Sequence, residues 1–214
     1  MKKDLRKEII ERRDLLTPDE IKEKSSLIRN QLFNMKEYIE CDSIFCFLSF
    51  GSEVITDEII KDALMTKKVF VPFVDRDEDL MYPIEIKNMD DFRVNKFGIR
   101  EPKSKGRFHL TRLVSRPVLL DRASQKETSP LTLVPGVAFD RKGYRIGYGK
   151  GYYDRFFHTF PVKSKIALAF GLQIIESVPF EEHDVPVDMI LTENELIRIT
   201  WQLICFSFCF FFSS

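Results

Sequence analysis

Glycines alternate with other residues in one segment of the chain, and this segment carries the densest chemical signal in the sequence. Gly147, Gly149 and Gly151 are separated by single residues, and Arg145 and Lys150 stand among them. Closely spaced glycines let the backbone adopt positive φ and approach a ligand, so that consecutive N–H groups bind an anion in one concavity. The two cations supply full charges for phosphate oxygens. The segment predicts a phosphate-binding loop, with a tight structural turn as the alternative.

The residues that follow the loop add two features of a nucleotide site. A helix that begins near Gly151 would direct the positive end of its dipole at the same anion. Asp154, a few residues further on, would hold a Mg²⁺ ion that bridges the phosphate oxygens. The loop matches neither GxxxxGK[ST] nor GxGxxG, so it is not a Walker loop or a dinucleotide fingerprint.

Apolar periodicity indicates which elements position this loop. Strands that alternate with helices favour α/β layers around a mainly parallel sheet. Pro72 indicates an edge or end position in its strand, and Thr56 is expected to cap the helix that follows it. Helices are predicted at 2–16, 18–38, 56–67 and from 151 onward. Strands are predicted at 43–50, 69–74, 80–86, 131–134, 166–170 and 189–192, and a surface loop at 121–130.

Composition limits the class of protein. A chain of 214 residues favours one domain. Its 44% hydrophobic residues are too many for a disordered chain. The 33 basic and 33 acidic side chains give a net charge of +0, which argues against a general nucleic-acid binder. We expect a globular domain that binds no nucleic acid.

Cysteine usage and the chain ends indicate a reducing compartment. Cys41, Cys46, Cys205 and Cys209 form no CxxC pair and no cluster with zinc spacing, so free thiols are expected. The charged N-terminal segment lacks the apolar stretch of a secretory signal. The apolar run at 199–212 is shorter than the about 20 residues that a membrane helix needs. We expect a cytoplasmic protein without a membrane contact.

Other residues are candidates for the same site. Glu53 follows a predicted strand, at the position where ligands usually bind in an α/β sheet, although an acid there also caps helices. Lys2 and Arg6 are neighbours on one helix face, where a solvated charged face is the alternative. Several aromatic residues are of the type that stacks on flat rings, although most aromatic residues are core. The three histidines form no visible triad, and none is assigned a catalytic role.

The segment PGVAFDRKGYRIGYGKGYYDRFF resembles the 5-formyltetrahydrofolate cyclo-ligase family, also called 5,10-methenyltetrahydrofolate synthetase. Three further stretches agree in order and spacing: KKDLR, FLSFGSEVITDEII, and ALAFGLQI followed by VPFEEHDVPVDMILTE. The resemblance covers residues 2–198. It implies a single three-layer α/β/α domain at 1–198 with a mainly parallel, mixed sheet of the NagB/RpiA/CoA-transferase-like type.

The resemblance also implies roles for individual residues. Lys150 and Arg145 would be catalytic, with Lys150 stabilising the transferring phosphoryl group, and Asp154 and Asp184 would bind Mg²⁺. From the residues alone, a solvated loop acid is the favoured interpretation of Asp184. ATP contacts would come from Lys2, Arg6, Arg145, Ile146, Gly147, Tyr148, Gly149, Lys150, Gly151, Tyr152 and Tyr153. Substrate contacts would come from Phe47, Leu48, Glu53, Tyr82, Phe97, Tyr148, Gly149, Lys150, Gly151 and Tyr152.

The activity implied is the ATP- and magnesium-dependent conversion of 5-formyltetrahydrofolate to 5,10-methenyltetrahydrofolate, with release of ADP and phosphate. ATP would be a co-substrate. The partner would be a reduced folate, with or without a polyglutamate tail, and we expect a monomer.

Two segments depart from the family pattern. Ser129-Pro130-Leu131-Thr132 replaces the usual Asp-Leu entry to the strand before the PG motif, and the phenylalanine-rich tail at 199–214 is unlike the family's endings. Two other functions stay open on the residues. One is an ATP-dependent kinase or ligase with a different acceptor, and the other is a non-catalytic folate- or nucleotide-binding module.

Overall fold

The computed structural model describes residues 1–95, 98–103, 130–160, 162 and 164–200. Most of the loop predicted at 121–130, Phe97 and the tail from 201 onward lie outside these residues. The α-helices are α1 (Lys2–Asp14), α2 (Pro18–Phe33), α3 (Lys36–Ile39), α4 (Asp57–Thr66) and α6 (Tyr152–Thr159). The 3₁₀ helices are η1 (Met89–Asp91) and η2 (Gly171–Gln173).

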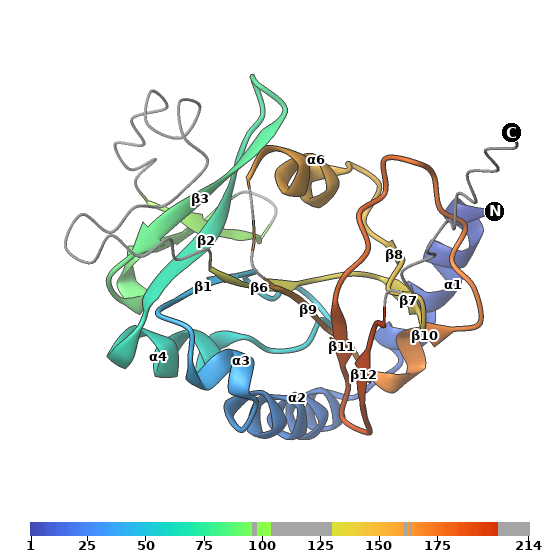
Figure 1. Ribbon diagram of the computed structural model, residues 1–214, viewed down its shortest axis with the longest axis horizontal. Coiled ribbons are helices and arrows are strands. Elements are labelled where there is room, and N and C mark those ends of the chain that lie inside the picture. Colours follow the sequence, from blue (N-terminus) through green and yellow to red (C-terminus); the bar gives the residue numbers. More distant parts are fainter. Residues whose placement is uncertain (96–97, 104–129, 161, 163, 201–214) are drawn as a thin grey trace, which may run out of the picture.

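A seven-stranded sheet forms the centre of the domain, in the order β12-β11-β9-β6-β1-β2-β3 (Figure 1). Neighbouring strands from β11 through β2 are parallel, and the edge pairs β11–β12 and β2–β3 are antiparallel. The predicted mainly parallel, mixed sheet is therefore confirmed. Its strands are β1 (Ser43–Cys46), β2 (Lys68–Asp75), β3 (Leu80–Ile86), β6 (Leu131–Val134), β9 (Ser164–Leu168), β11 (Met189–Leu191) and β12 (Leu196–Arg198).

Helices cover both faces of this sheet. On one face Ile44 and Cys46 of β1 pack with Ile28 and Leu32 of α2. On the other face Phe45 packs against α6. This separation follows from the strand geometry, because successive side chains of a strand point to opposite faces. Figure 1 shows α2, α3 and α4 on one side of the sheet and α6 on the other, which is the predicted α/β/α arrangement.

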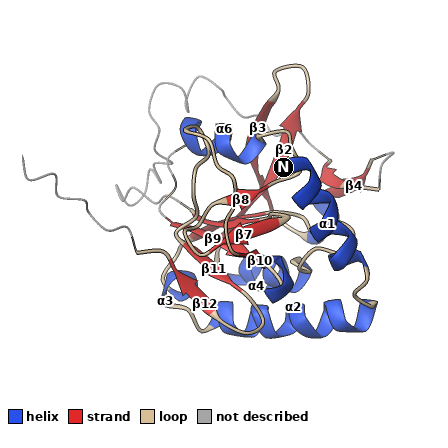
Figure 2. Ribbon diagram, turned by 90° about the vertical axis from the view of Figure 1, so that its right-hand side faces the viewer, coloured by secondary structure: helices blue, strands red, loops and turns tan. Residues whose placement is uncertain are grey.

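Two small sheets lie beside the central one. A three-stranded sheet has the order β10-β7-β8, and a two-stranded sheet joins β4 and β5. Figure 1 shows α1 at the same end of the molecule as β7, β8 and β10, and Figure 2 looks onto that end. The side chain of Ile9 on α1 packs with Ala138 and Ile146 of this small sheet. Their strands are β4 (Phe92–Val94), β5 (Arg100–Pro102), β7 (Ala138–Asp140), β8 (Arg145–Ile146) and β10 (Ile174–Ile175).

Several predicted boundaries were wrong. The first strand ends at Cys46, and residues 47–50 form a loop instead of continuing the strand. The helix predicted to residue 38 breaks at Asn34, and a short separate helix follows. Pro72 does not lie in an edge strand, because β2 pairs on both sides. The last residue pair between β1 and β2 is Phe45 with Phe70, and Pro72 lies beyond it. The N–H that proline lacks therefore removes no hydrogen bond to β1.

The N-terminus of α2 follows its predicted capping chemistry, whereas that of α4 does not. The Thr17 hydroxyl oxygen accepts a hydrogen bond from the N–H of Glu20, and the Glu20 carboxylate accepts one from the N–H of Thr17. Thr56 occupies the N-cap position of α4, but its side chain makes no capping bond. The Thr56 hydroxyl instead donates to the carbonyl oxygen of Phe47 (2.9 Å) and accepts from the N–H of Ser49 (3.1 Å). It therefore fixes the loop that follows β1.

The turn between β7 and β8 depends on Gly143. This residue has φ of +89°, and a Cβ atom there would lie 2.6 Å from the carbonyl oxygen of Val187. We expect Gly143→Ala to lower the free energy of unfolding by about 2 kcal/mol or more, because left-handed backbone alone costs about 1–2 kcal/mol. Urea denaturation measures this change. Gly147→Ala is the matched control, since Gly147 has open space around its Cα. Equal losses in both variants would contradict the steric explanation.

Within the described part of the chain, no helix combines the length and apolar character needed to cross a bilayer. Cys41 and Cys46 form no disulfide bond among the described residues.

Candidate active site

The chain leaves the neighbouring central strands β1 and β6 in opposite directions, at the carboxyl ends of these strands. From β1 the chain passes through α4 to β2 on one side, and from β6 it passes through α6 to β9 on the other. The two helices cover opposite faces of the sheet. Ligands of open α/β sheets bind at such a switch point, outside the carboxyl ends of the strands. The residues after β1 and β6 are therefore the candidates for ligand contacts.

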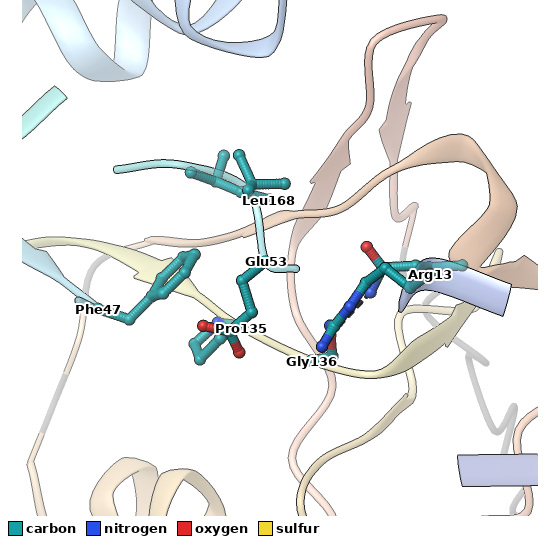
Figure 3. Close-up of a pocket in the computed structure, with 8 residues that line it drawn as sticks. Arg13, Phe47, Glu53, Pro135, Gly136 and Leu168 are labelled. Atoms are coloured by element: carbon teal, nitrogen blue, oxygen red, sulfur yellow. Dashed lines mark hydrogen bonds between the residues drawn. The ribbon is translucent and has the colours of Figure 1, made fainter. Parts of the chain in front are cut away.

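A pocket lies at this point. It is a half-open hollow of about 170 Å³, a volume that includes space open to solvent. The lining side chains leave no enclosed space for a water molecule, so a ring that binds here would have to move them apart. Figure 3 shows Glu53 between Phe47 and Arg13, with Pro135 and Gly136 beside it. The lining residues are Arg13, Phe47, Glu53, Val54, Pro135, Gly136, Leu168 and Gln173.

Glu53 is the acidic group of the pocket. Its side chain is buried, and it accepts hydrogen bonds from the N–H of Phe50 (2.9 Å) and the hydroxyl of Tyr148 (2.5 Å). Burial raises the pKa of Glu53, while these hydrogen bonds and the charge of Arg13 oppose the rise. The remaining lone pairs of its carboxylate suit a ligand that presents N–H donors.

A buried amide, the side chain of Gln173, also lines the pocket. Gln173 donates to the carbonyl oxygens of Gly136 (2.8 Å) and Val137 (3.0 Å), and it accepts from the N–H of Phe170 (2.8 Å). These bonds fix the chain just after β6. The pocket wall is thus preorganised by the 3₁₀ helix η2.

The glycine segment lies next to this pocket and is joined to it through Tyr148. Among the described residues, the backbone N–H groups from Gly149 through Asp154 have no hydrogen-bond acceptor. They include the free first turn of α6, whose N-cap Gly151 offers no side chain. Lys150 is exposed and pairs with no described acid. Free amides, a helix N-terminus and an available cation are the features of an anion site.

Helix α1 supports the glycine segment from one side. The guanidinium of Arg6 donates from Nε to the carbonyl oxygen of Gly147 (2.7 Å). Gly149 has φ of +95°, and a Cβ atom there would lie 3.3 Å from the Arg6 guanidinium. Glycine at this position therefore keeps the loop backbone close to a cation.

Arg145 and Asp154 form a largely buried ion pair below the loop. Nη2 of Arg145 donates to Oδ1 of Asp154 (2.8 Å), and Nη1 donates to the carbonyl oxygen of Val185. The guanidinium also lies over the Phe157 ring, 5.3 Å from its centre. Burial lowers the pKa of Arg145, and the charge of Asp154 opposes this. Because these bonds direct Arg145 inward, its present role is to join α6 to the segment before β11.

The two predicted magnesium ligands each keep one carboxylate oxygen available. Oδ1 of Asp154 accepts from Arg145 and from the N–H of Val185 (3.1 Å). Oδ2 of Asp184 accepts from Lys2 (2.7 Å) and from the N–H of Glu181 (2.8 Å). The second oxygen of each has no partner among the described residues. The described part of the chain contains no group of three His, Cys, Asp or Glu side chains that could hold a metal ion. One or two carboxylates completed by phosphates are a usual magnesium set, so the residues fit such an ion.

Most of the chain matches a known family. The model of the 5-formyltetrahydrofolate cyclo-ligase family matches residues 1–193. A probable 5-formyltetrahydrofolate cyclo-ligase from Caenorhabditis elegans is 34% identical, over 85% of this chain and 87% of its own length. The mouse 5-formyltetrahydrofolate cyclo-ligase is 30% identical, over 90% and 94%. The NMR structure of Aquifex aeolicus 5,10-methenyltetrahydrofolate synthetase aligns with a TM-score of 0.73 at 26% identity, covering 92% of both chains.

The chain belongs to the 5-formyltetrahydrofolate cyclo-ligase family. The predicted family and the ligase class are thereby confirmed. The same findings confirm the α/β fold, while the more specific NagB/RpiA label stays a prediction, as do the monomeric state and the cytoplasmic location.

The structure brings most of the predicted cyclo-ligase site residues together. Phe47 and Glu53 line the pocket, Tyr148 bonds to Glu53, and Lys2 and Arg6 of α1 contact the 181–184 loop and the glycine loop. Leu48 and Ile146 are buried in apolar clusters and lie outside the pocket lining. Phe97 lies outside the described residues.

Three predicted tyrosines lie around α6. Tyr82 on β3 meets Phe160 edge-on, with ring centres 6.4 Å apart, and burial together with a bond to Glu78 raises its pKa to about 12. The Arg155 guanidinium lies over the Tyr152 ring, 5.0 Å from its centre. The Tyr153 hydroxyl is buried without a described partner, and burial raises its pKa well above the usual value. Their ligand contacts stay predictions.

Arg13 is the main residue of the pocket that the sequence analysis missed. The sequence contains a pattern that could have identified Arg13. Steps of four and seven residues separate Lys2, Arg6 and Arg13, and this spacing places all three on one face of α1. The pattern was hidden because charged residues fill the helix. Gly136 and Gln173 were also missed, since the Gln173 side-chain amide donates to the Gly136 carbonyl oxygen and no motif spacing reveals such a bond.

Proposed function

We propose that this chain converts 5-formyltetrahydrofolate to 5,10-methenyltetrahydrofolate and that it uses one ATP, with ADP and phosphate as the other products. The observation that carries the proposal is the 2.5 Å hydrogen bond from Tyr148 to Glu53. It joins the phosphate-binding loop to the ring pocket. A nucleotide on the loop and a folate in the pocket would therefore be neighbours.

The chemistry explains why the two sites have to be adjacent. A formamide is a poor electrophile because nitrogen donation stabilises its carbonyl group. Transfer of the γ-phosphoryl group of ATP to the formyl oxygen makes that oxygen a good leaving group. N10 of the folate then attacks the activated carbon and gives up its proton to solvent, the carbon–oxygen bond breaks, and phosphate leaves with that oxygen. Phosphoryl transfer requires alignment and charge stabilisation from the protein and no protein nucleophile.

The residues of this chain supply that alignment. The free amides at 149–154 would bind the phosphate oxygens, and Lys150 would stabilise charge on the transferring group. Glu53 would accept the N–H groups of the pterin ring. Phe47 and Leu168 would cover the ring faces. A bound Mg²⁺, held by Asp154 and Asp184, would neutralise phosphate charge.

Replacing Asp184 with asparagine is expected to raise the Mg²⁺ concentration needed for half-maximal turnover by about tenfold or more, because one anionic ligand is lost. Asp154→Asn should do the same, but it also removes the charge partner of buried Arg145, so a lower melting temperature is expected there. A magnesium titration of each variant measures the first effect. Glu182→Gln, an exposed neighbour, is the control. Unchanged titrations in both aspartate variants would refute the ligand assignment.

ADP formation with and without 5-formyltetrahydrofolate tests the proposed reaction. We expect ADP to accumulate only when the folate is present, in a ratio of one ADP to each folate consumed. ADP formed at the same rate without folate would favour a kinase or ligase with another acceptor. Folate binding without any ADP would favour a binding module.

A further inference from the structure

Arg13 is a buried cation whose hydrogen bonds are incomplete. Its side chain is 3% exposed. Nε donates to the hydroxyl oxygen of Ser52 (2.9 Å), and Nη2 donates to the hydroxyl oxygen of Tyr148 (2.9 Å). Nη1 is buried and has no partner among the described residues. Buried polar groups are almost always hydrogen-bonded, so an exception in a native site requires an explanation.

The surroundings of Arg13 do not neutralise it by a direct ion pair. Its two partners are hydroxyl groups, and Ser52 in turn donates to the carboxylate of Asp14. Removing a guanidinium from water is costly unless its donors are satisfied. Since both wall residues, Arg13 and Glu53, line the same pocket (Figure 3), a ligand in the pocket would be the missing acceptor.

We propose that Arg13 is a substrate-positioning residue, whose Nη1 group donates a hydrogen bond to the ring carbonyl oxygen of the bound pterin. This inference rests on the proposed function, because it takes a reduced folate as the occupant of the pocket. It adds to that function a residue that determines which ring edge is accepted.

The chemistry of the ring edge matches the two walls. One edge of a pterin carries an amino group, a ring N–H and a carbonyl oxygen side by side. Glu53 has acceptor lone pairs for the two donors, and Arg13 has a donor for the carbonyl oxygen. A carboxylate alone would bind any ring with adjacent N–H groups. A charged donor beside the carboxylate makes the site selective for a ring whose edge carries a carbonyl oxygen next to the N–H groups.

Tyr148 links the proposed contact between Arg13 and the pterin ring to the glycine loop. The Tyr148 hydroxyl bonds to both Arg13 and Glu53, and Tyr148 belongs to the glycine loop. A ring seated between Arg13 and Glu53 therefore contacts the two residues that hold the loop. Correct seating of the ring would then coincide with correct placement of the phosphate-binding amides.

The test compares two ligands in the absence of ATP. One is 5-formyltetrahydrofolate, and the other is its 4-amino analogue, in which an amino donor replaces the carbonyl acceptor. Equilibrium binding is measured for wild type, Arg13→Leu and Arg12→Leu. Arg12 is the matched control because it stands one residue away on the exposed side of α1. The quantity of interest is the ratio of the two dissociation constants.

We expect Arg13→Leu to shift this ratio by about tenfold or more toward the amino analogue, the size of one hydrogen bond from a charged donor. Arg12→Leu should leave the ratio within about twofold of wild type. If Arg13→Leu does not fold, Arg13→Lys replaces it and is expected to shift the ratio in the same direction, because its shorter head cannot bond Ser52, Tyr148 and the ligand together. Equal loss of both ligands in the Arg13 variants would assign Arg13 a purely structural role. Failure of wild type to bind either folate would instead overturn the proposed function.

Discussion

Replacing Lys150 with alanine is expected to lower kcat by about 100-fold or more, while the dissociation constant of 5-formyltetrahydrofolate changes little. Removal of one oriented donor that stabilises developing charge has an effect of this size. Lys150 is exposed beside the free amides at the start of α6, and its ammonium pairs with no described acid. It is therefore available to a phosphate without first breaking an internal ion pair. Steady-state turnover at saturating ATP and folate measures the effect.

Lys142→Ala is the control for this substitution. Lys142 is an exposed lysine in the turn of the β7–β8 hairpin, within the same sequence motif. It removes the same charge from the protein at a position outside the site, so its turnover should match wild type. A kcat for Lys150→Ala within about threefold of wild type would remove Lys150 from the mechanism.

Replacing Glu53 with glutamine is expected to weaken binding of 5-formyltetrahydrofolate by about 100-fold. Hydrogen bonds to a charged group contribute about 1.5–3 kcal/mol each, and the ring would lose part of a charged acceptor. The KM for ATP should stay near wild type, because Glu53 lies in the ring pocket and contacts the glycine loop only through Tyr148. Binding titrations and separate KM values for the two substrates test this.

Glu53→Gln is expected to weaken folate binding and yet to increase the stability of the fold. Burial raises the folded-state pKa of Glu53 above its usual value of 4.5. A carboxyl group with a raised folded pKa holds its proton more tightly in the folded state, so the fold loses stability as pH rises through that pKa. Glu53→Gln removes this loss. The variant should therefore match wild type at acid pH and become progressively more stable than wild type as pH rises above about 4.5.

Thermal unfolding of both proteins across this pH range measures the difference. A wild type that gains stability over Glu53→Gln with rising pH would show that the hydrogen bonds from Phe50 and Tyr148 outweigh burial. A variant with tighter folate binding would contradict the assigned role of Glu53.

The sequence predicted the elements that have local signals. The capping box at Thr17 and Glu20 marks the start of α2, and the apolar run around Phe45 predicts a buried strand, which β1 is. The glycine motif predicted an anion site, and its amides are free at the N-terminus of α6. Each of these features is determined within a few residues along the chain.

Features that depend on distant partners could not be predicted in this way. Thr56 has the sequence of a helix cap, but its hydroxyl bonds to the 47–49 loop, because that loop folds back over it. Arg145 has the type and position of a phosphate ligand, yet it bonds to Asp154 and to the carbonyl group of Val185. Arg13 became visible only when α1 was placed against the pocket.

The central claim is that the glycine loop and the Glu53 pocket act on one substrate pair, with a phosphoryl group passing from ATP to a formyl oxygen. The most direct measurement mixes the protein with Mg-ATP and 5-formyltetrahydrofolate and follows the absorbance of the methenyl product. We predict that this absorbance rises with time, needs both ATP and magnesium, and nearly vanishes for Lys150→Ala. No rise in absorbance with folded protein and all three components present would contradict the claim.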